Sequence, residues 1–286
     1  MQHPVKGIDH CFALVDDLDS AAAQYRALGF TVSPRGLHSA SKGTANHTIM
    51  FPDDYFELLG VLVPTAANAA RRATLQTMKQ GLHAIACRIA SAPDAAAALG
   101  AMGIATQGLG SFSRPVDLSD GSTGVAAFST VAFTPDDTPR GIVFMCAHDT
   151  PETVWVPDLL SHENTAAGLG AVVALSDDPA TDAAGFARLW ADGSVTAQDG
   201  TYTVHTGVRS APLVLADADH LGAYYAGIDL SGTTRGAFTA LRIKVHDLSA
   251  VAACLTRAEI TATATPAGLA ISPEHAAGVL MEFIPT

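Results

Sequence analysis

A repeated unit of strand, acidic turn, alanine-rich helix and glycine constrains this chain more than any other feature. Its first copy begins at Gly7, continues through an apolar stretch from Ile8 to Val15, and reaches a second glycine at Gly29. The turn after the apolar stretch carries Asp and Ser residues, which cap helix N-termini, and glycine is common just beyond a helix C-terminus. The pattern therefore predicts a buried strand, a helix and a following strand.

This unit occurs four times. The second copy has glycines at Gly81 and Gly103, which lie 74 residues after Gly7 and Gly29 (81 − 7 and 103 − 29). A third copy starts near Leu169, and a fourth runs on from position 241. Four copies in 286 residues give units of roughly 70 residues, too long for a solenoid repeat. We therefore predict an α+β chain of four βαβββ modules.

Several short motifs support this reading. They are "GIDHCFALVDDLDSA…LGF" at the start, "YFELLGV" at 55–61, "IKVHDLSAV" in the fourth unit and "GVLMEF" at 278–283. In these motifs and their order, the chain resembles glyoxalase-like members of the vicinal oxygen chelate superfamily. The resemblance implies two curved mixed sheets, each built from two modules, with helices on the convex side and a metal or ligand in the concave face.

Modules that follow one another in the chain are expected to pair, because sequential elements tend to be neighbours. We predict a first domain at 1–149, a linker at 150–165 and a second domain at 166–286. The linker contains Trp155, which is too apolar to stand free in water and is expected to pack as a flap. The alternative pairing, of module one with module four, would place Glu282 beside His10.

The charge and cysteine content exclude several classes of protein. The chain has 16 Lys and Arg residues and 28 acidic residues, for a net charge of −12, and its basic residues form no stripe. We therefore expect no nucleic-acid partner. We expect no membrane partner either, because no apolar run reaches transmembrane length. The N-terminus lacks a hydrophobic signal core, which predicts a cytoplasmic protein, and four cysteines without CxxC spacing predict free buried thiols.

Two positions in each module carry the chemistry that the resemblance implies: a ligand near the start of the first strand and a carboxylate in the fourth. In module one these are His10 and Glu57. The corresponding residues are Ala84 and Met145 in module two, Ala171 and Val214 in module three, and Ala240 and Glu282 in module four. Glu57 lies among apolar residues, where a carboxylate is costly unless it is paired or ligating. A neutral imidazole with a carboxylate suits a divalent Zn, Fe, Mn or Ni ion.

A tight metal site needs a third ligand, and three residues are candidates. His148, just beyond the last strand of module two, reaches the site if modules one and two share a sheet. Glu282 serves if modules one and four pair. His83 matches Asp9 rather than His10, so the alternation of a strand points it to the opposite face unless a bulge intervenes. We take His10, Glu57 and His148 as the predicted ligands.

Other polar residues are expected to bind or move groups of a substrate. Glu57 and His38 are candidate catalytic residues, the latter as a proton shuttle on a glycine-flanked loop. Arg114 and Phe112 are candidate substrate-binding residues in a loop over the concavity, where Arg114 can bind a carboxylate or phosphate group bidentately. His47 can lie on either face of its strand. His162 and His246 are expected at the surface.

Three functions fit these residues. The first is a metal-dependent lyase, isomerase or dioxygenase acting on a small oxygenated substrate. The second is a metal-free protein that sequesters a small molecule in the same pocket. The third is a metal-free catalyst in which His10 and Glu57 act as acid and base. Missing ligands in module two argue against true glyoxalase I activity, and a homodimer is the commonest assembly to consider.

Overall fold

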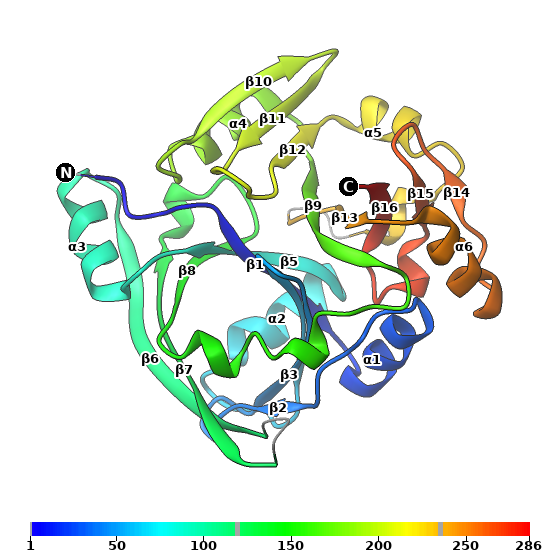
Figure 1. Ribbon diagram of the computed structural model, residues 1–286. Coiled ribbons are helices and arrows are strands. Elements are labelled where there is room, and N and C mark those ends of the chain that lie inside the picture. The colour runs from blue at the N-terminus through cyan, green and yellow to red at the C-terminus, as the bar shows by residue number, and fades with distance from the viewer. Residues whose placement is uncertain (1, 118–120, 234–236) are drawn as a thin grey trace.

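The computed structural model describes residues 2–117, 121–233 and 237–286 (Figure 1). Module one consists of β1 (Ile8–Val15), α1 (Leu18–Ala27), β2 (Gly36–Leu37), β3 (Thr44–Met50) and β4 (Tyr55–Val61), and α2 (Ala69–Met78) follows it. Module two consists of β5 (Gly81–Arg88), α3 (Ala92–Ala101), β6 (Thr106–Asp117), β7 (Thr123–Phe133) and β8 (Ile142–His148). Short 3-10 turns at Pro151–Thr153 and Pro157–Leu159 lie in the connection that follows.

The second half repeats the same order of elements. Module three consists of β9 (Ala166–Leu175), α4 (Pro179–Ala187), β10 (Ser194–Gln198), β11 (Thr201–His205) and β12 (Leu213–Ala216), followed by α5 (Ala218–Tyr224). Module four consists of β13 (Ala240–Val245), α6 (Leu248–Arg257), β14 (Thr263–Ala264), β15 (Leu269–Ile271) and β16 (Leu280–Pro285). The predicted α+β fold of four βαβββ modules is confirmed.

The modules pair in chain order. In the described residues the first eight-stranded sheet has the order β2-β3-β4-β1-β5-β8-β7-β6, and the second has β10-β11-β12-β9-β13-β16-β15-β14. The first sheet curls until its edge strands β2 and β6 touch, and Figure 1 looks into this near-barrel. Glu282 belongs to the second sheet, so it cannot be the third ligand of His10.

Strand register shows which residues of the first two modules correspond. His10 of β1 lies opposite Ala86 of β5, and Ala84 of β5 lies opposite Phe12 of β1. His10 and Ala84 are 74 residues apart, as are Phe12 and Ala86. An approximate twofold axis between the two strands therefore relates the two pairs. Ala84 is therefore the counterpart of His10, as expected from the sequence.

The counterpart of Glu57 differs by one position from the sequence prediction. Glu57 pairs with Phe12 across β1 and β4, and the equivalent pair across β5 and β8 joins Ala86 to Phe144. Phe144, not Met145, therefore occupies the equivalent place. A one-residue error moves a side chain to the opposite face of a strand, and Met145 indeed packs in the main hydrophobic core.

Helices of the four modules cover the convex faces, where a shared hydrophobic core joins the two sheets. Each of these helices follows an Asp or Ser whose side chain accepts a backbone N–H, which satisfies a donor otherwise left free at a helix start. The four capping residues are Asp17, Ser91, Asp178 and Asp247. Even-numbered residues of β1 from His10 onward face the other way, into the concavity.

The connecting helices α2 and α5 lie on the concave sides instead. Leu75 of α2 packs against Phe12 and Leu59 in the first sheet. In the second sheet, Leu221 of α5 and the following Tyr225 pack directly on the concave face. This packing fills the place that corresponds to the concavity of the first sheet.

Three local predictions need correction or comment. Phe112 and Arg114, predicted in a loop, belong to the long edge strand β6, in which Pro115 is tolerated because an edge strand has unpaired N–H positions. The sequence Asp120-Gly121-Ser122, which predicts a hairpin turn, lies partly outside the described residues. All four cysteines are free and buried, as predicted. No helix in the described residues is long and apolar enough to span a membrane.

Candidate active site

The concave face of the first sheet encloses a cavity of about 270 Å³. Arg71 of α2 and residues from the strands of both modules line it. Its polar lining consists of His10, His38, Lys42, Thr44, Asn46, Tyr55, Glu57, Arg71, Arg114 and Thr130, and its aromatic lining of Phe12, Phe112, Phe128 and Phe144. The volume lies just below the usual range of about 300–1,000 Å³ for small-molecule pockets, which suits a small ligand.

A β-bulge places Asp9 beside His10. The pairing of β1 with β5 shifts between Ile8 and His10, which leaves Asp9 as an extra residue. Regular alternation had put Asp9 on the convex face. The bulge instead lets Asp9 and His10 face the same side, and sequence reasoning missed Asp9 for this reason.

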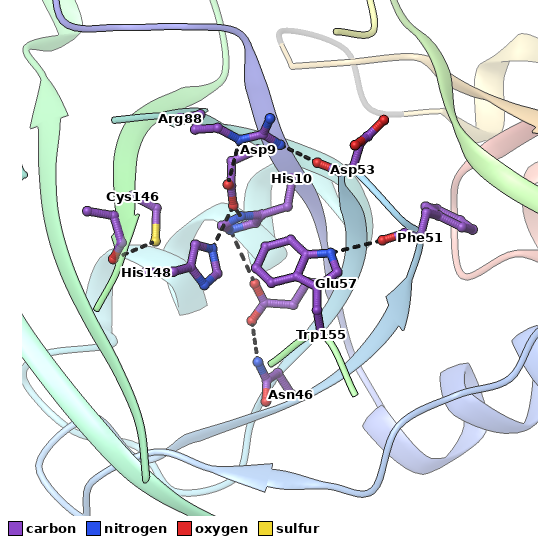
Figure 2. A network of polar contacts seen from close by, with 11 residues as sticks. Asp9, His10, Asn46, Phe51, Asp53, Glu57, Arg88, Cys146, His148 and Trp155 are labelled. Atoms are coloured by element: carbon purple, nitrogen blue, oxygen red, sulfur yellow. Dashed lines mark hydrogen bonds and ion pairs between the residues drawn. The ribbon is translucent and has the colours of Figure 1, made fainter. Parts of the chain in front are cut away.

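Asp9 is the centre of a buried hydrogen-bond network (Figure 2). Its Oδ1 accepts from His10 Nδ1 at 2.8 Å and from His148 Nε2 at 2.9 Å, and its Oδ2 faces Arg88 Nε at 3.3 Å. Burial would raise the pKa of Asp9, but the hydrogen bonds from the two imidazoles hold that pKa far below its usual range. Asp9 is therefore an ionised acceptor at neutral pH.

This network decides which nitrogen of His10 is free. An ionised carboxylate can only accept, so His10 Nδ1 carries the proton. In the neutral ring the lone pair is then on Nε2, which points toward Glu57 in the cavity. Carboxylate partners of this kind orient metal-ligating and catalytic histidines.

His10 and Glu57 form the reactive end of the cavity. His10 Nε2 and Glu57 Oε2 lie 3.7 Å apart, too far for a hydrogen bond but close enough for both to contact one ion or one substrate atom. Asn46 Nδ2 donates to Glu57 Oε1 at 2.9 Å and fixes the carboxylate. Tyr55 stacks on the His10 ring with centroids 4.2 Å apart. Both side chains are thus held in place before any ligand arrives.

The donor set fits a divalent ion at His10 and Glu57 better than at Asp9. Among the described residues, the group of three potential ligands that lie within reach of one another is Asp9, His10 and His148. Both imidazoles already donate to Asp9, and the Arg88 guanidinium beside it opposes a second cation. His10 Nε2 and Glu57 Oε2 present two free donors of the types that Zn and similar ions prefer.

His148 reaches this centre through Asp9 rather than through the cavity. Its Nε2 is bonded to Asp9, and its buried Nδ1 has no partner in the described structure. It packs edge-on against Trp155 and Phe128, and the described cavity lining does not include it. His148 therefore lies beside Asp9 and His10, outside the lining of the cavity that His10 and Glu57 share.

Of the other histidines singled out in the sequence, all but one lie outside the cavity lining. His83 sits at the matching bulge of β5, yet its Nε2 is bonded to the Lys79 carbonyl and it stays outside the cavity. His47 is bonded to the Ser33 carbonyl. His162 was predicted at the surface and is instead buried, with Nε2 on the Met50 carbonyl.

His38 is the exception, because it lines the cavity. Its Nδ1 contacts Thr44 Oγ1 at 2.7 Å. Burial lowers the pKa of His38 to about 4, despite the nearby Glu57 carboxylate. His38 is therefore neutral at physiological pH, and it can accept a hydrogen bond or a proton but holds no proton to give as an imidazolium.

Arg114 and Phe112 line the cavity from β6. Phe112 stacks on Phe128 with centroids 5.0 Å apart, and Lys42 Nζ lies 3.4 Å from the Phe112 ring centre. The guanidinium of Arg114 crosses directly over Gly36, where a Cβ atom would come within 2.7 Å of Arg114 Cζ. Sequence reasoning missed Lys42 and Arg71, which also line the cavity.

A second cavity of about 280 Å³ adjoins the first. The two share the side chains of Asn46, Tyr55, Arg114 and Phe128 as lining. Residues of the connection at 153–159 cover this second cavity, and the indole N–H of Trp155 donates to the Phe51 carbonyl at 2.9 Å. Trp155 is thus packed, as expected for a flap.

Glu282 is the carboxylate of the second sheet that corresponds to Glu57. It is fully buried. Its oxygens accept from Arg242 Nε at 2.6 Å, from the hydroxyls of Tyr224 and Tyr225, and from Thr265. Every ligand position of this carboxylate is used within the protein, so it is a structural ion pair.

Comparison with known proteins agrees with this architecture. The family described as Glyoxalase-like domain matches residues 8–190, well over half of the chain. The chain therefore belongs to the glyoxalase-like domain family of the vicinal oxygen chelate superfamily. A search of curated proteins finds no significant match.

Solved structures share the fold at low sequence identity. A hypothetical protein from Staphylococcus aureus is 13% identical, with a TM-score of 0.66 over 98% of this chain and 99% of its own. An extradiol ring-cleaving dioxygenase from B. fuscum is 13% identical, with a TM-score of 0.58 over 100% of this chain and 73% of its own. Homoprotocatechuate 2,3-dioxygenase from Arthrobacter globiformis is 14% identical, with a TM-score of 0.58 over 100% of this chain and 81% of its own. At these identities the likeness shows the fold alone.

Proposed function

We propose that this chain is a vicinal oxygen chelate enzyme that acts on a small oxygenated substrate at His10 and Glu57, with a divalent metal held by these two residues. The observation that carries the proposal is the 3.7 Å separation of His10 Nε2 and Glu57 Oε2 at the end of a cavity. Lyase, isomerase and dioxygenase chemistry all fit such a site.

A divalent ion bound there supplies Lewis-acid stabilisation of negative charge on two neighbouring substrate oxygens. The residues of the chain prepare this end of the cavity. Asp9 keeps the proton on His10 Nδ1, and Asn46 holds one oxygen of Glu57, so that Nε2 and Oε2 are presented together. Two protein donors leave several positions open for substrate and water.

His38 is proposed to orient the substrate by hydrogen bonding. Burial lowers its pKa to about 4, so the ring is neutral and only a weak proton acceptor at neutral pH, and Thr44 fixes it through Nδ1. Glu57 is the proposed proton acceptor if it is not ligating.

A metal-free binding protein is the second candidate. The observation in its favour is that the approximate twofold axis brings Ala84 and Phe144, rather than ligands, to the places of His10 and Glu57. Four phenylalanines in the cavity lining also suit capture of an apolar ligand. This candidate needs neither turnover nor a bound ion.

Metal content of the purified chain tests the proposal. We expect close to one ion per chain after addition of Zn, Mn, Ni or Fe(II) and removal of excess, measured by elemental analysis. His10→Ala and Glu57→Gln should lose the ion, whereas Glu152→Gln, which removes an exposed carboxylate, should keep it. No bound ion in the wild type with any of these metals would reject the metalloenzyme and leave the binding protein.

A further inference from the structure

Three cations converge on the cavity, and none has an ion-pair partner among the described residues. Lys42 comes from the loop before β3, Arg71 from α2 and Arg114 from β6. In the described part of the chain none of the three forms an ion pair, whereas most of the other arginines do, including those at 35, 88, 140, 188, 209, 242 and 257. The contrast marks these three side chains as unusual.

Keeping these cations in the cavity is costly. All three are withdrawn from bulk water, and burial lowers the pKa of each. The buried Nε of Arg71 also has no hydrogen-bond partner in the described structure. An unpaired buried charge destabilises a fold, so the fold alone gives no reason for these residues.

The charges of the cavity do not balance. Glu57 is the lining carboxylate, so three cations and one anion leave a net charge of +2 when both lining histidines are neutral. The whole chain, in contrast, carries −12. A divalent ion at His10 and Glu57 would increase the excess, so a negative ligand is favoured with or without a metal.

The rest of the lining is apolar. Phe12, Phe112, Phe128 and Phe144 supply aromatic walls, and the volume of about 270 Å³ limits the ligand to a small molecule. Gly36 leaves the room in which the Arg114 guanidinium lies. A planar guanidinium binds carboxylate or phosphate groups through two parallel hydrogen bonds.

We propose that the cavity binds a small organic oxyanion with an aromatic or apolar body, and that its carboxylate or phosphate group is held by Arg71, Arg114 and Lys42. The proposal rests on the proposed function only in placing the reacting end of the ligand at His10 and Glu57. The oxyanion site itself needs no metal and no turnover. Its test is therefore a binding measurement on chelator-treated protein.

The probes are 3-phenylpropanoate, its uncharged amide 3-phenylpropanamide, and 2-phenylethyl phosphate, titrated by calorimetry. We expect one site per chain for at least one anionic probe, with the amide at least tenfold weaker. Tighter binding of the carboxylate identifies a carboxylic acid ligand, and tighter binding of the phosphate identifies a phosphate ester. Equal affinity for the amide and both anions, or binding of none of them, would overturn the proposal.

Matched variants locate the site. Arg114→Gln and Arg71→Gln should each weaken anion binding by about ten- to a hundredfold, the effect of losing a charged hydrogen-bonding partner. Arg26→Gln removes an exposed arginine on the outer helix α1 and should leave affinity unchanged. Because the two cavity arginines lack ion pairs, their variants should melt at the same temperature as the wild type or higher. Unchanged affinity in both cavity variants would refute the assignment, and so would a fall in affinity for Arg26→Gln of equal size.

Discussion

Asp54 should make the stability of this protein depend on pH in an unusual direction. It lies in the turn before β4, nearly buried, and its Oδ1 accepts the Leu169 N–H of β9 at 3.0 Å, so it joins the two sheets. Burial raises the pKa of Asp54 to about 7, against the lowering effects of the Leu169 hydrogen bond and of Arg88 and Lys244. The native protein therefore keeps this proton in a range where the unfolded chain releases it.

The sign and size follow from linkage. Between about pH 4 and pH 7 the native state binds more protons at Asp54 than the unfolded state, so the free energy of unfolding falls as pH rises, and then levels off. A pKa that moves from 3.8 to about 7 changes the free energy of unfolding by about 4 kcal/mol, at about 1.4 kcal/mol for each pH unit.

Asp54→Asn tests this reasoning, because an amide keeps the acceptor for Leu169 but carries no charge. Urea unfolding of both proteins between pH 4 and pH 8 isolates Asp54, since every other titrating group is common to the two. We expect the variant to gain on the wild type by up to about 4 kcal/mol as pH rises through this range. A difference that stays constant with pH would show that Asp54 is not protonated in the native protein.

Three further predictions concern the polar networks and the cavity. Asp9→Asn should lower the free energy of unfolding at pH 7 by about 3 kcal/mol, because it removes the buried negative charge beside two imidazoles and Arg88 and turns one acceptor oxygen into a donor. Since the pKa of Asp9 is held low, the wild type keeps this stability above about pH 4 and loses it in more acidic solution. An unchanged urea midpoint for Asp9→Asn at pH 7 would contradict the stabilising role of Asp9. Glu282→Gln should lower the free energy of unfolding in urea by about 3–5 kcal/mol, because it breaks the buried pair with Arg242. Binding of 3-phenylpropanoate should be unchanged. A loss of binding would show that the second sheet contributes to the cavity of the first. Gly36→Ala should displace both the Asn46 side chain and the Arg114 guanidinium and weaken that binding several-fold by calorimetry. Wild-type affinity would place the anion elsewhere.

The fold was predictable because two features of the sequence repeat: the order of apolar and alanine-rich segments, and the spacing of the glycines. Apolar stretches alternate with alanine-rich segments that start at Asp or Ser, and the glycine spacing of 74 residues matches His10 with Ala84, which agrees with the pairing of β1 and β5. Local signals failed at β6. Its polar and glycine-rich sequence is typical of a loop, but an edge strand with one exposed face tolerates such residues.

The candidate site was predictable only in part. His10 and Glu57 stood out as polar residues in apolar strands, and the structure brings them together. Asp9 was missed because alternation assumes a regular strand, and a bulge breaks that rule. An Asp inside an otherwise apolar strand was itself a signal, since a buried carboxylate needs partners.

Contacts between residues far apart in the chain explain why the other cavity residues were not predicted. Lys42 and Arg71 reach the cavity only because the sheet curls and α2 packs against it. Neither event has a signature in a window of sequence around the residue. The burial of Glu282 was equally unpredictable from the sequence, because its partners Tyr224 and Tyr225 lie far from it in the chain. They reach it because α5 packs on the concave face of the second sheet.

Anomalous diffraction from crystals soaked with Mn²⁺ or Zn²⁺ tests the central claim most directly. The two overlapping donor sets meet at His10, so the position of the ion distinguishes them. We predict one peak about 2.0–2.2 Å from His10 Nε2 and Glu57 Oε2, with Asp9 still hydrogen-bonded to His10 Nδ1. A peak between Asp9 and His148, or no peak near His10 at all, would contradict the account.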